Sequence, residues 1–341
     1  MSQSLPLFPE SASSSAAQVD YLALALLGIT LFFSLGIACT LVYFTARYWH
    51  AREAPRGRHI SNRAHWIIES TWIAIPLAIL IAIFVWGAKV YVSAHEPPDD
   101  SLEIYVVGKQ WMWKIAHPEG RREINELHIP LGQPIRLTMI SEDVIHSFYV
   151  PEFRVKQDVV PGRYSTLWFE PTKPGRFHLF CAEYCGTSHA KMIGEVVVMP
   201  PEDYADWLEG SEDEQPSLAQ EGEAIMQEVG CNQCHDPQDG NHQGPELLTL
   251  YNQMVELDRG GWVRADQEYI RRSILEPASE GRLGFAKTMP SYEGKLSAEQ
   301  IVAITAYLKE QATQPRSDER SLVTATDDLS LTNANDTTSH P

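Results

Sequence analysis

The sequence predicts a multidomain membrane protein with a two-helix transmembrane hairpin, an all-β sandwich and a mostly α-helical C-terminal domain. Three observations lead to this fold class. Two long uncharged apolar segments lie near the N-terminus, patterns of short strands follow them, and the hydrophobic period becomes helical towards the C-terminus. The 341 residues carry a formal net charge of −18, which argues against nucleic acid as a partner.

The two apolar segments predict the membrane hairpin. Residues 21–46 and 70–88 contain no charged side chain, and each is close to the roughly 20 residues that cross a bilayer. We therefore expect an N-terminal tail at 1–20, transmembrane helices at 21–46 and 65–92, and a loop at 47–64. A cleaved signal peptide is the alternative for the first segment, but no Lys or Arg precedes it and its apolar run is too long.

Charge in the loop sets the orientation of the hairpin. The loop at 47–64 contains five arginines and one glutamate. Positively charged loops stay in the cytoplasm, so both the N-terminus and the large C-terminal region are expected on the outer side. Membrane lipid is thus one expected partner of the chain.

Two residues of the hairpin differ from their apolar surroundings. Glu69 lies near the cytoplasmic end of the second helix, where an ionisable group is costly and suggests function. A carboxylate at the membrane interface is the alternative. Cys39 is expected to be a small apolar residue of the first helix. Neither helix has an interior histidine to bind a cofactor, so chemistry inside the membrane would belong to a partner.

Residues 97–200 predict the sandwich. Apolar or alternating strands are expected at 104–107, 135–139, 165–169 and 196–199. Turn-forming proline and glycine residues separate these strands. Short strands punctuated in this way indicate an all-β sandwich or barrel.

The composition changes after residue 200. No Lys or Arg occurs between Lys191 and Arg259, whereas 16 Asp and Glu do. This acidic stretch could steer a basic donor protein or simply form a solvated surface. We expect a linker at 201–216, a helical domain at 217–312 and a disordered tail at 313–341. A capping box at 297–300, followed by apolar residues at helical spacing, predicts the last helix.

The first cluster of metal-binding residues lies at the end of a predicted strand. Cys181, Cys185, His189 and Met192 fall within twelve residues. Sulfur and imidazole ligands select copper, and two cysteines can bridge two copper ions. A binuclear site needs a second imidazole, for which His146 is the best candidate. A structural disulfide is the alternative outside the cytoplasm, but it needs neither the second histidine nor the methionine. The other nearby histidines are expected to be ordinary strand residues: His117, His128 and His178.

The second cluster is Cys231-Asn-Gln-Cys234-His235, the attachment motif of c-type haem. Two thioether bonds fix the porphyrin, and the adjacent imidazole becomes the proximal iron ligand. A redox dithiol and half of a zinc site are alternatives, but neither a βαβ context nor a later cysteine pair supports them. Met289 is the better candidate for the distal ligand and Met254 the weaker. A Met/His pair would raise the haem potential and suit electron transfer.

These motifs resemble subunit II of cytochrome c oxidase, in the bacterial form with a cytochrome c domain fused at its C-terminus. The resemblance covers residues 21–311 and rests on three stretches: Asp143-Val-Ile-His146-Ser-Phe-Tyr-Val-Pro-Glu-Phe, Lys156-Gln-Asp158-Val-Val-Pro-Gly-Arg163 and Cys181-Ala-Glu-Tyr-Cys185-Gly. It implies a cupredoxin sandwich with a binuclear copper centre at 97–200 and a cytochrome c domain at 217–312. It also implies a bacterial inner membrane, with both domains in the periplasm.

The resemblance also implies roles for individual residues. Trp111, within Gln110-Trp111-Met112-Trp113, matches the residue where electrons enter from cytochrome c, although Met112 stands where the family usually has Tyr. Glu69 matches the carboxylate at the mouth of a proton path into subunit I. The Glu183 carboxylate would reach a magnesium ion shared with subunit I. The implied ligands of the binuclear copper centre are His146, Cys181, the backbone carbonyl of Glu183, Cys185, His189 and Met192.

The implied function is electron entry into a proton-pumping terminal oxidase. Electrons would pass from the covalent haem c to the copper centre and on to the haem-copper site of subunit I, where dioxygen is reduced. The expected partners are subunit I, other oxidase subunits, and donor cytochrome c or the cytochrome bc complex. The alternative is the electron-entry subunit of a copper-containing nitric oxide reductase, which only the sequence of subunit I would distinguish. A quinol oxidase is disfavoured because its equivalent subunit lacks the copper ligands.

Overall fold

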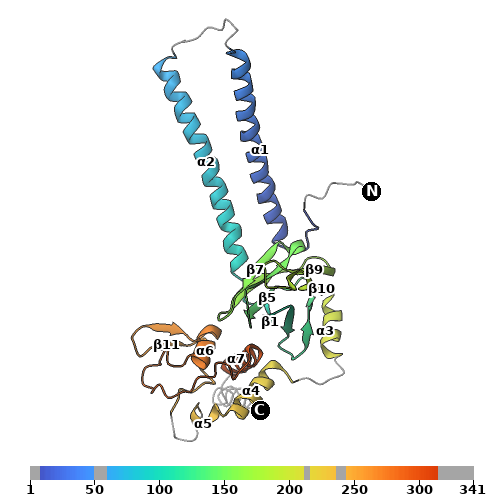
Figure 1. Cartoon of the computed structure of the whole chain (residues 1–341), viewed down its shortest axis with the longest axis vertical. Coiled ribbons are helices and arrows are strands. Elements are labelled where there is room, and N and C mark those ends of the chain that lie inside the picture. The colour runs from blue at the N-terminus through green and yellow to red at the C-terminus, as the bar shows by residue number, and fades with distance from the viewer. Residues whose placement is uncertain (1–7, 50–59, 211–215, 236–242, 314–341) are drawn as a thin grey trace, which may run out of the picture. The chain divides into compact units, whose positions relative to one another are not determined.

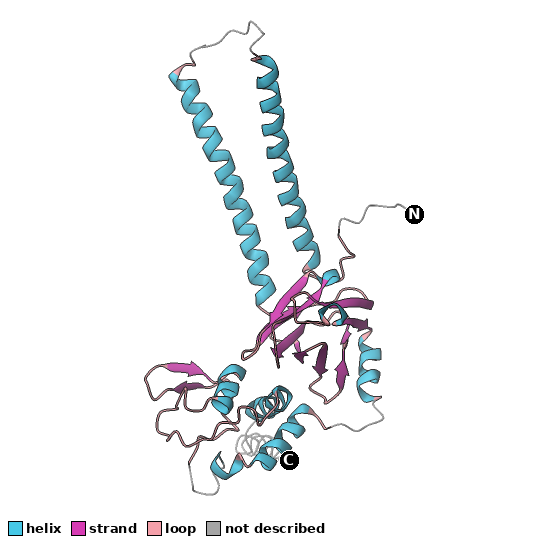
Figure 2. Cartoon of the chain, in the orientation of Figure 1, coloured by secondary structure: helices cyan, strands magenta, loops and turns pink. Residues whose placement is uncertain are grey.

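A computed structural model of the chain describes residues 8–49, 60–210, 216–235 and 243–313 (Figure 1). The chain divides into two units: Met1–Ile115 with Arg122–Gly210, and Ala116–Arg121 with Ser211–Pro341. The first unit contains a helical hairpin and a β-sandwich, and the second is mostly helical (Figure 2). The predicted fold class is confirmed.

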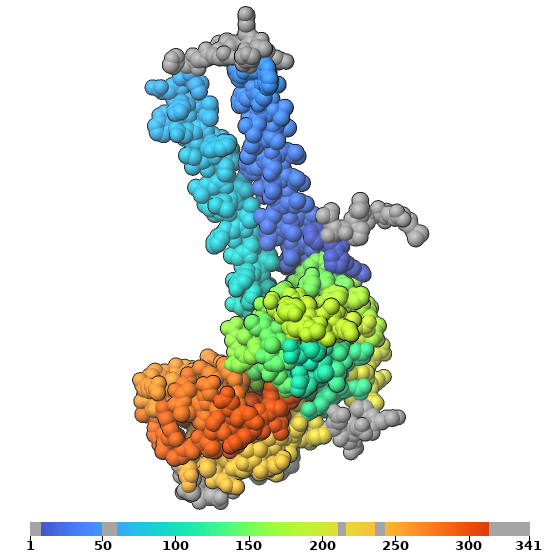
Figure 3. Space-filling view, viewed as in Figure 1, coloured from blue at the N-terminus to red at the C-terminus, as the bar shows by residue number. Residues whose placement is uncertain are grey.

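The hairpin consists of helices α1 (Ala16–Arg47) and α2 (Asn62–His95), both long and apolar enough to cross a membrane. Ser61 caps α2 by accepting a hydrogen bond from the Ala64 N–H at 3.3 Å. Apart from Ala16, the first residue of α1, no described residue of the two helices is buried, and both helices are largely uncovered on the face shown in Figure 3. So much exposed apolar surface requires lipid or partner subunits to cover it.

The segment before α1 packs on the sandwich, which corrects the expected tail at 1–20. Ala12 is fully buried in the sandwich core, and its N–H donates to the Glu152 carbonyl at 3.0 Å. Arg154 Nε donates to Asp20 Oδ1 at 2.8 Å. Long-range backbone pairing of this kind leaves no local sequence pattern. Because these contacts join the start of α1 to the sandwich after α2, both ends of the hairpin lie on one side of the membrane.

The sandwich contains two five-stranded sheets, with strand orders β3-β2-β1-β5-β8 and β4-β10-β9-β6-β7. The four predicted strands correspond to β1, β5, β8 and β10. The strand bounds are β1 (Leu102–Lys109), β2 (Met112–Ala116), β3 (Arg122–Ile124), β4 (Glu126–Pro130), β5 (Ile135–Ser141), β6 (His146–Val150), β7 (Val155–Val159), β8 (Ser165–Phe169), β9 (Gly175–Cys181) and β10 (Ile193–Met199). Two short 3₁₀ helices, η1 (Pro151–Phe153) and η2 (His189–Lys191), lie after β6 and before β10.

Pairing of β6 with β9 determines which residues meet at one end of the sandwich. The two strands are antiparallel, with Phe148 opposite Cys181. Fully buried aromatic side chains, including Trp113 and Phe148, fill the space between the sheets, and their burial stabilises this register. The start of β6 is thereby fixed beside the end of β9.

Helix α3 (Pro201–Glu209) occupies most of the expected linker at 201–216, which is a second correction. Tyr204 is 7% exposed, and Trp207 stacks on His128 with ring centroids 4.6 Å apart. The apolar side of this short helix therefore packs on the sandwich. The acidic composition suggested a linker because the acidic side chains lie on the outer face of this helix and give no sign of its apolar side. Residues 211–215 lie outside the described part of the chain.

The second unit is built around the packing of α4 (Leu218–Val229) against α7 (Ala298–Thr313). The predicted capping box of α7 is present, with the Gln300 N–H 3.3 Å from Ser297 Oγ. Gly222 permits close approach, because a Cβ there would lie 2.1 Å from the Ala303 carbonyl oxygen. Between these helices in sequence lie α5 (Asn232–His235), β11 (Met254–Glu256), β12 (Trp262–Arg264) and α6 (Gln267–Leu275). The predicted tail at 313–341 lies outside the described residues after 313.

Candidate functional site

Five predicted metal-binding side chains meet at one end of the sandwich. His146 begins β6 and Cys181 ends β9, so the pairing of these strands brings them together. The loop after β9 returns Cys185 to the same place, and η2 carries His189. Met192 follows η2 and is 1% exposed. Donor atoms from two strands and one loop therefore share one position, where all of these residues except the partly exposed His189 are buried.

The donor atoms form a continuous cluster. Cys181 Sγ lies 4.0 Å from His146 Nδ1 and 3.8 Å from Cys185 Sγ. Cys185 Sγ lies 3.4 Å from His189 Nδ1 and 3.7 Å from Met192 Sδ. Two sulfur atoms that bind the same soft metal ion, each at about 2.3 Å, can be at most about 4.6 Å apart. The two thiols, both free in the structure, satisfy that limit.

The two cysteines differ in acidity. Burial opposes ionisation of Cys181, but hydrogen bonds from His146 and from backbone groups outweigh it and lower the Cys181 pKa to about 6. Burial and the charge on Cys181 raise the pKa of Cys185 to about 12. Cys181 therefore ionises more readily than Cys185. A metal ion favours the second thiolate, because a coordinated thiol loses its proton.

Asp143 orients the imidazole of His146 and was not assigned a role from the sequence. His146 Nε2 lies 2.8 Å from Asp143 Oδ1. This hydrogen bond directs Nδ1 towards the sulfur of Cys181, so Nδ1 is the nitrogen that would bind a metal ion. Burial opposes ionisation of Asp143, but the N–H of Gln110 and the contact with His146 outweigh it and lower its pKa. The spacing of three residues between Asp143 and His146 was the available sequence signal.

Two further predicted residues border the cluster. The Glu183 carbonyl oxygen lies 3.3 Å from Cys181 Sγ, whereas the residue as a whole is exposed. Trp111 is partly buried against the sandwich core, close to the backbone of Gly186. Glu69 is elsewhere, on α2, where its carboxylate lies 3.5 Å from His65 Nε2 and is half exposed.

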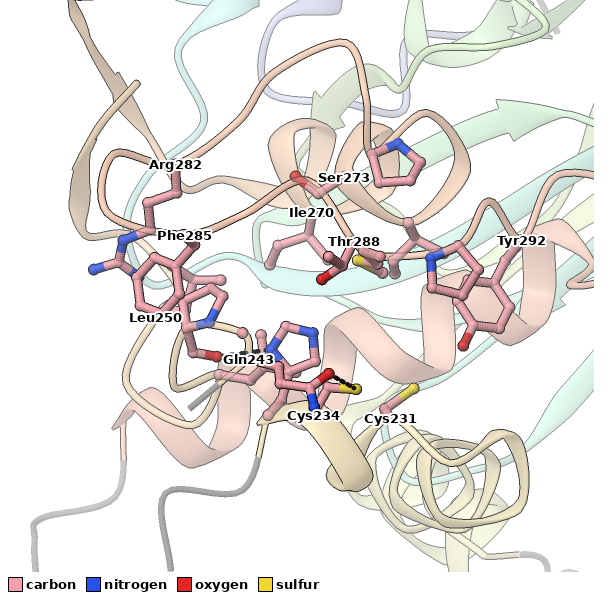
Figure 4. Close-up of a pocket in the computed structure, with 18 of the residues that line it drawn as sticks. Cys231, Cys234, Gln243, Leu250, Ile270, Ser273, Arg282, Phe285, Thr288 and Tyr292 are labelled. Carbon is pink, nitrogen blue, oxygen red and sulfur yellow. Dashed lines mark hydrogen bonds between the residues drawn. The ribbon is translucent and has the colours of Figure 1, made fainter. Parts of the chain in front are cut away.

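The second unit contains an apolar pocket that the haem motif lines (Figure 4). Cys231, Cys234 and His235 line it, and so does Met289. Apolar side chains from α4, α6 and α7 make up much of the rest: Met226, Ile270, Ile274, Ile304 and Leu308. Residues 236–242, directly after the motif, lie outside the described part of the chain.

The geometry of His235 suits an axial ligand. Its Nδ1 lies 2.7 Å from the Pro245 carbonyl oxygen, so Nδ1–H donates and Nε2 is left as the ligating atom. Gly244 lies so close that a Cβ would be 2.6 Å from the ring. Met289 lines the pocket, whereas Met254 is 52% exposed on β11 and does not line it. The structure therefore favours Met289 over Met254 as the distal candidate.

The remaining histidines of the sandwich region have other neighbours. His128 contacts the carboxylate of Glu123 through Nδ1 and stacks on Trp207. His178 stacks on Phe180 with ring centroids 5.6 Å apart, and His117 is fully buried. Two groups of possible metal ligands are found among the described residues: the buried one contains His146 with the two cysteines, and the more exposed one contains His128 with Glu123 and Glu126.

Two protein families match the chain. Residues 121–199 match the family described as cytochrome c oxidase subunit II, periplasmic domain. Residues 217–308 match the family described as cytochrome c oxidase, cbb3-type, subunit III. The two matches fall on the sandwich and on the helical unit that contains the pocket.

Several relatives are similar over most of their own length. Cytochrome c oxidase subunit 2 of Alkalihalophilus pseudofirmus is 30% identical over 272 residues, which cover 76% of this chain and 78% of the relative. An alternative cytochrome c oxidase subunit 2 of Bradyrhizobium diazoefficiens is 30% identical over 214 residues, covering 53% and 76%. A crystal structure of the periplasmic domain of subunit II of cytochrome oxidase from Bradyrhizobium japonicum is 33% identical. That comparison covers 34% of this chain and 97% of the solved one, with a TM-score of 0.33.

Proposed function

Because the chain belongs to the cytochrome c oxidase subunit II family, we propose that it is the electron-entry subunit of a proton-pumping terminal oxidase. It takes electrons from cytochrome c and delivers them to subunit I, where dioxygen is reduced. The observation that carries the proposal is the donor cluster around Cys181 and Cys185, with neighbouring donor atoms 3.3 to 4.0 Å apart. A disulfide-stabilised sandwich would use neither the histidines nor the methionine of this cluster.

The donor set fits a pair of copper ions. Thiolate, imidazole and thioether donors select copper, and the two cysteine sulfurs, 3.8 Å apart, would hold the pair of ions between them. The imidazoles of His146 and His189 lie next to different cysteines, His146 beside Cys181 and His189 beside Cys185. Met192 and the Glu183 carbonyl complete the set. Each ion would thus have its own imidazole and one weaker donor, which would make the two positions similar.

The pocket of the second unit fits a covalent haem c. Cys231 and Cys234 would bind the porphyrin through thioether bonds, His235 would be the proximal ligand and Met289 the distal one. Arg282 also lines the pocket, stacks over Phe285 at 5.7 Å and forms no ion pair among the described residues. A guanidinium in an apolar pocket suits a haem propionate.

When bound, the haem and the copper pair supply one-electron transfer, and the protein supplies their surroundings. Asp143 holds His146 in one orientation, and the Pro245 carbonyl does the same for His235. Burial of both cysteines excludes water, and rigid strands keep the donors in place. Fixed ligands lower the rearrangement that accompanies each change of charge.

The membrane hairpin is proposed to anchor the sandwich next to subunit I. The arginine-rich loop is proposed to lie in the cytoplasm and the sandwich in the periplasm, next to the inner bacterial membrane. The exposed Glu183 side chain is proposed to share a magnesium ion with subunit I. Glu69, half exposed on α2, is proposed to lie at the mouth of a proton path. Residues 182–192, between β9 and β10, carry Cys185 and are called the copper loop. Trp111, which lies beside this loop, is the proposed electron-entry residue.

The test is metal and haem analysis of the oxidase purified in detergent. We expect about three copper ions for each copy of this chain, one of them in the haem-copper site of subunit I, and one covalent haem, with hyperfine splitting from two equivalent copper nuclei in the electron paramagnetic resonance spectrum. Cys185→Ser should remove the paired-copper spectrum and retain the haem. Cys234→Ser should impair haem attachment and retain the copper. Cys39→Ser, in α1, is the matched control and should change neither.

The copper and haem results test the two proposed sites separately. A preparation with covalent haem but no paired-copper spectrum, and with Cys181 disulfide-bonded to Cys185, would contradict the binuclear site. Copper without covalent haem would contradict the cytochrome assignment of the second unit.

A further inference from the structure

Gln110 connects the tryptophan segment to the copper loop and to the loop between β5 and β6. Its side-chain Nε2 donates to the Cys185 carbonyl oxygen at 2.7 Å. Its backbone N–H donates to Asp143 Oδ2 at 2.8 Å, and the other oxygen of that carboxylate lies 2.8 Å from His146 Nε2. The residue next to Trp111 therefore contacts the backbone of one proposed ligand and, through one carboxylate, the imidazole of another.

A glycine makes room for this junction. Gly186, directly after Cys185, has φ +118°, which other residues rarely adopt. A Cβ at this position would lie 2.7 Å from Gln110 Nε2 and 3.4 Å from Trp111 Nε1. The amide and the indole thus both pack directly against the backbone of the loop that carries the proposed sulfur ligands.

The indole N–H of Trp111 does not hold this side chain in place. The buried Trp111 Nε1 has no hydrogen-bond partner within the described part of the chain. The neighbouring residue supplies the polar contacts instead, one from its side chain and one from its backbone. A side chain held only by packing can change rotamer when its backbone is released.

We propose that Gln110 is a positioning residue for electron entry, which holds Trp111 against the copper loop through the Cys185 carbonyl and Asp143. The inference rests on the proposed function, because it assumes that Trp111 mediates transfer into the copper pair. The backbone hydrogen bond to Asp143 survives substitution, whereas the amide hydrogen bond to Cys185 does not. Substitution should therefore loosen the entry segment while the metal ligands keep their own contacts.

Gln110→Glu in the assembled oxidase is the sharpest variant, because it keeps the length of the side chain and replaces an N–H donor by an oxygen that repels the Cys185 carbonyl. Gln110→Ala removes the amide without adding charge. Gln133→Glu, in the exposed turn between β4 and β5, makes the same change of charge in the same unit and is the matched control. Three quantities are measured: the copper resonance spectrum, the rate of copper reduction by ascorbate with a small mediator, and the rate of electron transfer from the reduced haem to copper.

We expect Gln110→Glu to slow haem-to-copper transfer about tenfold, as expected when one good hydrogen bond no longer favours the packed conformation. Gln110→Ala should slow it less, and Gln133→Glu should not slow it. The copper spectrum and the ascorbate rate should match wild type. An unchanged transfer rate in both Gln110 variants would overturn the inference, as would a changed copper spectrum, which would make Gln110 a support of the ligands. Wild-type protein without paired copper would instead refute the proposed function.

Discussion

Replacing Gly222 with alanine should destabilise the second unit, although alanine is the better helix former. In an uncrowded helix the change would stabilise the fold by about 1 kcal/mol. Here the new Cβ would lie 2.1 Å from the Ala303 carbonyl oxygen, about 1.3 Å short of the 3.4 Å at which ordinary contact begins. The clashing atoms belong to the backbone of α7, so the two helices must separate. Overpacking of this kind costs up to about 3 kcal/mol, which leaves a net loss of about 2 kcal/mol.

The assay is urea unfolding of the haem-loaded protein in detergent, followed by the circular dichroism of the haem band. That signal reports on the relevant unit, because Met226 of α4 and Ile304 of α7 both line the pocket. Gln227→Ala, at an exposed position of α4, is the control and should leave the midpoint almost unchanged. A Gly222→Ala protein as stable as wild type, or more stable, would refute the close crossing of α4 and α7.

Three further predictions concern the haem and the sandwich. Met289→Ala should leave the iron high-spin and lower the haem potential in optical and potentiometric titrations; Met254→Ala should do neither, and the reverse result would exchange their roles. Arg282→Gln should lower the haem potential, because removing a nearby cation disfavours the extra electron; an unchanged potential would place the propionates elsewhere. Hydrogen bonds from Lys156 and Ser147 hold the pKa of Asp158 below its ordinary value, so its charge stabilises the fold above about pH 3.9, and this contribution is lost as the pH falls through the lowered pKa. Asp158→Asn should therefore lower the Tm at pH 7, with a difference that shrinks in acid; a difference independent of pH would contradict this reasoning.

The chemistry of the two sites could be predicted from the sequence because their ligands are local. Cys181, Cys185, His189 and Met192 lie on one short stretch of chain, and the haem motif is contiguous. Metal selection depends on which donor types are present, and attachment of haem depends on spacing within a few residues. The hairpin could likewise be predicted from the sequence, because crossing a bilayer requires only a long apolar run.

Only the tertiary structure decided how distant segments meet. Pairing of β6 with β9 places His146 beside Cys181 across 35 positions of sequence, which no local period encodes. The burial of Ala12 in the sandwich core and of the apolar side of α3 also depends on contacts with distant parts of the chain. The junction of Gln110, Asp143 and Cys185 joins three loops, and each contributes polar atoms that any loop could carry. Composition and spacing specify which groups are present, whereas strand register and packing between the sheets determine which of them come within bonding distance.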